Sequence, residues 1–174
     1  MYKIWRSFYY ELTIFVAVKL IILAIGKPNE PYIKEGVEMF TSRLQHYFPT
    51  EWKIIPPLKN SAVLDTKNLM MEEGKKLLKE ILPGDYVVLL DERGKQFSSV
   101  DLSAFILKIS NESFKRIVFI IGGAFGVDQT VRGKADLTWS LSKLVFPHML
   151  VRLILAEQLY RACTILKNEK YHHV

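Results

Sequence analysis

Hydrophobic and polar positions alternate along the chain in a way that predicts strands and helices in turn. Residues 20–25, 85–90 and 116–121 are short runs of mostly apolar side chains. Runs of this length are typical of strands that are covered on both faces of a parallel sheet. Shorter strands are expected at residues 52–55 and 137–141.

Between these runs, apolar residues recur at spacings of three and four, the pattern of one face of an amphipathic helix. Ser98 or Ser99 is expected to cap the third helix, and Pro147 suits the first position of the last one. Strands that alternate with helices predict a single α/β domain with a mostly parallel sheet. The expected helices cover residues 33–47, 70–81, 102–109 and 127–135 and a long segment from 147 to about 166.

Parallel sheets bind ligands at the carboxyl ends of their strands, so the loops after Leu90, Ile121 and Leu141 are the expected place for a site. Residues 122–126, Gly-Gly-Ala-Phe-Gly, have neither the G-x-G-x-x-G spacing of a dinucleotide fingerprint nor the ending of a P-loop. Glycine lets a backbone approach a ligand closely because it has no Cβ. A tight structural turn explains the same residues equally well.

Residues 140–148 pass from a strand-like run into a helix without the usual Gly or Asn. Backbone groups displayed there could recognise an adenine edge, although a plain strand and helix cap would give the same pattern. His148 and Arg152 are four residues apart on one face of the final helix, beside these loops. They are candidates for binding a phosphate or a base, with an ordinary ion pair as the alternative for the arginine.

The final helix is apolar on nearly all sides, which in a chain of this size indicates burial on several sides and a subunit interface. The polar tail that follows contains Tyr171 and His172. These two residues could supply a stacking ring and a titratable group, whereas a frayed terminus is the simpler interpretation.

Composition narrows the classes of function. The chain has 174 residues, enough for one domain, and 24 Lys and Arg against 18 Asp and Glu give a net charge of +6. A basic balance favours a polyanionic partner such as nucleic acid. The single cysteine, Cys163, excludes an intramolecular disulfide and indicates the reducing cytoplasm. The four histidines have no metal-ligand spacing, so no metal is expected.

Residues 1–17 are rich in aromatic residues and contain no Gly or Pro and no lasting helical or strand periodicity. They are predicted to be an extension outside the domain at 18–174. The apolar stretch 12–25 is too short to span a bilayer and contains Lys19, so no membrane anchor is expected. Glu11 before this stretch disfavours a signal peptide. Val18 is the expected natural start, and the extension is expected to be dispensable.

Several motifs now stand in order along the chain. They are Leu-Ala-Ile-Gly-Lys at 23–27, Leu-Leu-Asp-Glu-Arg-Gly-Lys at 89–95, Phe-Ile-Ile-Gly-Gly-Ala-Phe-Gly at 119–126, Leu-Ser-Lys-Leu-Val-Phe-Pro-His at 141–148, Glu-Gln-Leu-Tyr-Arg-Ala at 157–162 and Tyr-His at 171–172. In order and spacing they closely resemble the ribosomal RNA large subunit methyltransferase H family, small enzymes of the SPOUT class. The resemblance covers residues 19–172.

This resemblance implies an α/β fold with a C-terminal trefoil knot near residues 141–147, and a cytoplasmic homodimer. The implied substrate is a pseudouridine in a stem-loop (helix 69) of 23S ribosomal RNA, methylated at N3 on assembled ribosomes. The family has a glycine near Asn168, and asparagine also tolerates a left-handed backbone. S-adenosylmethionine is the implied cofactor, enclosed mostly by the backbone of Leu90, Gly122, Leu141, Ser142, Lys143, Leu144, Val145 and Phe146.

Methyl transfer to N3 requires an aligned donor and removal of the N3 proton. We assign Arg152 to the developing anion, and His148, Tyr171 or His172 to positioning the base or relaying its proton. A non-catalytic RNA- or ribosome-binding module of the same fold is the alternative. A nucleotide-dependent dehydrogenase is disfavoured because the glycine turn comes late in the chain.

Overall fold

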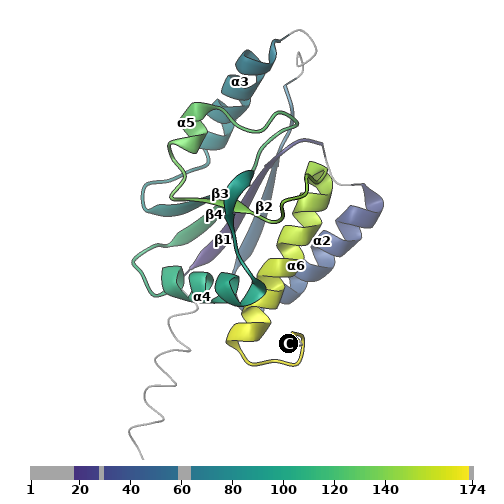
Figure 1. The fold of residues 1–174 in the computed structure, drawn as a ribbon, viewed down its shortest axis with the longest axis vertical. Coiled ribbons are helices and arrows are strands. Elements are labelled where there is room, and N and C mark those ends of the chain that lie inside the picture. Colours follow the sequence, from purple (N-terminus) through teal and green to yellow (C-terminus); the bar gives the residue numbers. More distant parts are fainter. Residues whose placement is uncertain (1–17, 28–29, 59–63, 173–174) are drawn as a thin grey trace, which may run out of the picture.

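A computed structural model describes residues 18–27, 30–58 and 64–172, so the predicted extension at 1–17 lies outside the described residues. Within them, five strands form one sheet in the order β2-β1-β4-β3-β5, and every neighbouring pair is parallel (Figure 1). The predicted α/β class is confirmed. The strands are β1 (Lys19–Ile25), β2 (Thr50–Ile55), β3 (Asp85–Gln96), β4 (Arg116–Ile121) and β5 (Leu137–Ser140).

Helices cover both faces of this sheet. The helices are α2 (Pro31–Leu44), α3 (Thr66–Leu78), α4 (Ser99–Ser110), α5 (Gln129–Arg132) and α6 (His148–Leu166). One core cluster joins even-numbered β1 residues such as Leu20 and Ile22 to α2, α4 and α6, and a second joins the odd-numbered Ile21 and Leu23 to α3 and α5. Burial on both faces explains why the strand sequences are continuously apolar.

Helix starts follow the expected signals with small shifts. Ser98 caps α4, and its side chain and that of Asp101 form a capping box. Pro147 takes the N-cap position of α6, so the helix begins one residue later than expected, at His148. The predicted helix at 127–135 is reduced to the four residues of α5, because Asp128 caps its start and Gly133 ends it.

Strand β3 differs most from the expectation. A loop was predicted directly after Leu90, but the strand continues to Gln96 and pairs with β5 on both sides of an irregularity between Leu90 and Lys95. Gly94 makes this possible, since a Cβ there would lie 2.6 Å from the carbonyl of Thr138. The residues between the two paired parts leave the ladder at the carboxyl end of the sheet.

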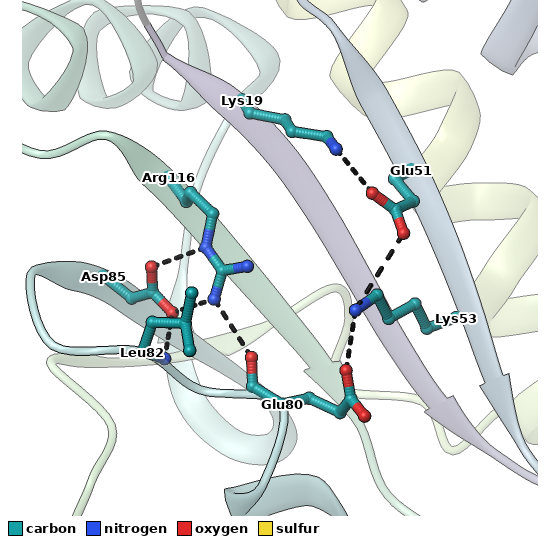
Figure 2. Close-up of polar contacts among 7 residues, drawn as sticks. All are labelled: Lys19, Glu51, Lys53, Glu80, Leu82, Asp85 and Arg116. Carbon is teal, nitrogen blue, oxygen red and sulfur yellow. Dashed lines mark hydrogen bonds and ion pairs between the residues drawn. The ribbon is translucent and has the colours of Figure 1, made fainter.

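Charged side chains meet at the amino ends of β1, β3 and β4, the opposite end from the predicted site (Figure 2). The Arg116 guanidinium donates to Asp85 through Nε at 2.7 Å and also to the carbonyl of Glu80. The hydrogen bond to Asp85 and the negative charge of that carboxylate raise the pKa of Arg116. The same figure shows Lys53 joining Glu51 to the Glu80 carboxylate, which ties the edge strand β2 to the end of α3.

Breaking this pair should destabilise the protein. We expect Arg116→Met to lower the free energy of unfolding by about 2 kcal/mol, because it leaves the largely buried Asp85 carboxylate without its cation. Urea denaturation measures the change. The control is Lys34→Met in the exposed Lys34–Glu38 pair, for which a change of at most about 0.5 kcal/mol is expected. Equal losses in the two variants would contradict the role given to Arg116.

Candidate active site

A cavity of about 350 Å³ opens at the carboxyl ends of β3, β4 and β5. Its volume lies within the usual range for small-molecule sites. Three segments far apart in the sequence build its walls: residues 90–93, 121–126 and 139–146, with His148 and Val151 of α6 and Arg132 of α5 completing it. The predicted loops after three strands therefore do meet.

The glycine turn is folded tightly on itself. Gly126 has a positive φ of 80°, and its N–H donates to the Gly123 carbonyl at 3.0 Å. A Cβ on Gly122 would lie 2.9 Å from the backbone of Gly126, closer than real Cβ contacts. The turn thus presents bare backbone to the cavity, as a site that holds a ligand through backbone groups requires.

Two serines shape the segment between β5 and α6. The Ser140 hydroxyl donates to the Ser142 carbonyl at 2.7 Å, and the Ser142 hydroxyl accepts from the N–H of Leu144 at 3.0 Å. These local bonds replace the Gly or Asn that usually marks such a passage. Leu144 and Val145 are 69% and 78% exposed at the lip of the cavity.

Three charged residues, Asp91, Arg93 and Arg132, form another part of the cavity wall. Arg93 and Arg132 both donate to Asp91, at 3.0 and 2.6 Å. Burial would raise the pKa of Asp91, but hydrogen bonds from the two arginines outweigh burial and lower it to about 2. Asp91 is therefore a carboxylate at neutral pH that is largely neutralised by its partners.

His148 and Arg152 project from the first turns of α6. Burial, assisted by the charge of Arg152, lowers the pKa of His148, so its imidazole is neutral at physiological pH. Arg152 is fully buried and donates to the carbonyls of Lys27 and Ile25, at 2.9 and 3.2 Å. Its guanidinium therefore holds the end of β1 in place. Of the two residues, His148 lines the cavity and Arg152 does not.

Tyr171 and His172 lie toward the other end of α6. The Tyr171 hydroxyl donates to Glu157 at 3.1 Å, and Glu157 also pairs with Arg161 as expected for residues four apart. Nine residues separate Glu157 from His148, about 14 Å along a helix. Asn168 makes the turn into the tail with a φ of 54°, so it has the left-handed backbone that asparagine was expected to tolerate.

The structure thus brings most of the predicted site residues together. Of the eight predicted for the cofactor, Leu90, Gly122, Leu141, Ser142, Leu144, Val145 and Phe146 line the cavity. Lys143 is exposed and does not line it. His148 lines it, whereas Arg152, Tyr171 and His172 do not.

Sequence reasoning missed three side chains on the wall. Asp91 and Arg93 belong to a polar motif that follows a strand, which is a usable signal, while Arg132 lies in a short helix and gives none. Across 18–27, 30–58 and 64–172 there is no group of three or more His, Cys, Asp or Glu that could hold a metal. In the same part of the chain, no helix is long and apolar enough to cross a bilayer.

The chain is similar to known proteins over most of its length. The family model described as "Predicted SPOUT methyltransferase" matches residues 18–172. The chain is 46% identical over 152 residues to ribosomal RNA large subunit methyltransferase H of Christiangramia forsetii, covering 87% of this chain and 97% of that protein. It is 43% identical to the protein of the same name from Parabacteroides distasonis, covering 90% and 99%.

The solved structure of a probable methyltransferase from Bordetella pertussis Tohama I has the same fold. Its TM-score is 0.52 at 13% identity, and the match covers 89% of this chain and 99% of that one. SPOUT methyltransferases use S-adenosylmethionine, and the glycine cradle and backbone-rich walls of the cavity fit that molecule. The chain is a methyltransferase and belongs to the ribosomal RNA large subunit methyltransferase H family of the SPOUT class.

Proposed function

We propose that this enzyme methylates N3 of a pseudouridine in the helix 69 stem-loop of 23S ribosomal RNA, on assembled ribosomes in the cytoplasm. One observation carries the proposal: residues 90–93, 121–126 and 139–146 meet around one cavity. These are the segments that bear the family motifs. The relatives named above are ribosomal RNA methyltransferases by name. The expected trefoil knot near residues 141–147 stays a prediction.

Different residues of the cavity would bind the cofactor and accept the proton. Residues 122–126 and 141–146 would hold the cofactor, which supplies an activated methyl group when bound. His148, neutral because of its lowered pKa, can accept the N3 proton directly or through water. In the transfer, the carbon–sulfur bond of the donor would break and leave its electron pair on sulfur as N3 bonds to the methyl carbon, and the proton on N3 would go to His148 or solvent.

Recognition of the RNA would begin with charge. The chain carries a net charge of +6, and Arg93 extends from the cavity wall with a largely exposed side chain. Phosphate attraction of this kind is independent of sequence and cannot select one stem-loop. Ribosomal surface around the stem-loop would complete the selection, which is why we propose action on assembled ribosomes.

We further propose that the enzyme acts as a homodimer. Phe125, Leu144 and Val145 expose 58%, 69% and 78% of their area around the cavity mouth, where a second copy would cover them. Within one chain, the Tyr171 hydroxyl contacts Glu157, about half the length of α6 away from His148, and His172 follows Tyr171 directly in the sequence. If these residues act on the base, they must come from the second copy.

The test is mass spectrometry of 23S ribosomal RNA from cells that lack the gene. We expect the methyl-pseudouridine signal to disappear and to return with the wild-type gene. Unchanged methylation would refute the proposed substrate. The alternative, a non-catalytic module, predicts that the purified chain binds no S-adenosylmethionine at near-physiological concentration, which calorimetry decides separately. The domain boundary at Val18 stays a proposal, tested by deleting residues 1–17 and measuring folding and activity.

A further inference from the structure

Glu73 is a buried carboxyl group that the site described above does not use. It lies in α3 and is only 7% exposed. Among the described residues it makes no hydrogen bond and no ion pair within 4 Å. Burial raises the pKa of Glu73, and the charge of Lys76 one turn away partly opposes that rise. Burying most of a carboxyl group without a close partner is costly, so its position calls for a functional reason.

The carboxyl group lies directly behind the glycine turn. A Cβ built on Gly123 would be 2.5 Å from Oε2 of Glu73, so nothing stands between that oxygen and the Gly123 backbone. Gly123 itself lines the cavity. The Glu73 carboxyl group does not line the cavity itself, but it lies against Gly123, a residue that does.

Gly74 explains how α3 comes so close. A Cβ at Gly74 would be 2.5 Å from Oδ1 of Asp128, the residue that caps α5 after the glycine turn. Any larger residue would push the helix away from the turn. The adjacent pair Glu73-Gly74 thus places a carboxyl group against this wall and makes room for it, although glycine weakens the middle of a helix.

The other acidic groups near the cavity are either ion-paired or exposed to solvent. Asp91 is held by Arg93 and Arg132, so its charge is largely compensated. Glu92 is exposed to solvent at the rim, where water screens it. Lys76 directs its ammonium group to the carbonyl of Pro56 at 3.0 Å. Glu73 is left as the buried acidic group beside the glycine wall that has no close cationic partner among the described residues.

We propose that Glu73 is a positioning residue that makes the cavity discriminate between ligands by their charge. S-adenosylmethionine carries a sulfonium cation, whereas S-adenosylhomocysteine, the product after methyl transfer, is a neutral thioether at the same atom. A carboxylate buried behind the wall attracts the cation through a medium less polar than water and gives no such attraction to the thioether. Glu73 therefore favours binding of the donor and release of the product.

Calorimetry with the full chain and three ligands tests this inference. The ligands are S-adenosylmethionine, S-adenosylhomocysteine and sinefungin, an unreactive analogue with a protonated amine near the sulfonium position. Glu73→Gln should weaken binding of the two cationic ligands about tenfold, equal to 1.4 kcal/mol, and change binding of the thioether less than about twofold. Glu73→Asp, which keeps the charge, should preserve most of the preference for the cationic ligands.

Glu72→Gln is the matched control, because it removes the same charge one residue away on α3, where Glu72 pairs with Lys75 in solvent. It should leave all three affinities unchanged. If Glu73→Gln lowers the three affinities equally, or not at all, the inference is overturned and Glu73 only supports the fold. Should the amide variant fail to fold by circular dichroism, Glu73→Met replaces it with the same expected pattern. The inference rests on the cofactor and not on the proposed RNA target, so neither failure implies the other.

Discussion

Arg152→Met is expected to lower the free energy of unfolding by about 4 kcal/mol. The guanidinium is fully buried and donates to the carbonyls of Ile25 and Lys27, and methionine would leave both carbonyls without these donors. The connection after β1 would lose its attachment to α6. Urea denaturation followed by circular dichroism measures the loss.

A second measurement separates support of the fold from an effect on His148. Burial is the larger cause of the lowered pKa of His148 and the charge of Arg152 the smaller one, so removing that charge should raise this pKa. If neutral His148 is needed, the acidic limb of the pH–rate profile should move to higher pH. Arg161→Met is the control on the same helix, since Arg161 pairs with Glu157 at a partly exposed position and should cost less than about 1 kcal/mol. A similar loss for both variants would contradict the assignment.

Gly122→Ala should weaken S-adenosylmethionine binding roughly a hundredfold, or about 2.8 kcal/mol. The new Cβ would collide with the backbone of Gly126 and with Val127 at 2.9 Å, and backbone cannot move aside as a flexible side chain can. The turn must open, and with it the wall of the cavity changes shape. Calorimetry on the purified variant gives the affinity, and thermal melting reports whether the rest of the fold is intact.

Gly133→Ala is the matched control for this substitution. Gly133 has a helical φ of −67°, and its nearest atom to a new Cβ is 3.4 Å away, an ordinary contact. Alanine there should keep the cofactor affinity and leave stability unchanged or slightly improved. Normal binding by the Gly122 variant would show that the shape of the turn is not what the cofactor requires.

Much of the fold was predictable from local patterns. Strands β1 and β4 are buried by helices on both sides from their second residue onward, so every residue after Lys19 and Arg116 had to be apolar. The length of β3 was not predictable, because Asp91 and Arg93 look like loop residues. They are accommodated only by an irregular pairing with β5, a strand that lies some forty residues later.

The site was predictable where backbone builds it and unpredictable where distant side chains do. Residues 122–126 and 141–146 follow strands, so the general rule for parallel sheets located them. Glu73 reaches the same wall from α3, and only tertiary packing around Gly123 brings it there. Tyr171 is a residue that the sequence placed at the site and the structure does not. Its motif suggested a role there, but after the turn at Asn168 its hydroxyl bonds to Glu157.

The strand order also governs when the enzyme can become active during synthesis. The first strand of the described chain, β1, lies between β2 and β4, and its Lys19 pairs with Arg116. Closing such distant parallel pairings is slow, because a long stretch of chain must be ordered first. The last wall of the cavity comes from residues 139–146. A nascent chain that ends before this segment would therefore contain the central strand pair but no place to receive the methyl donor.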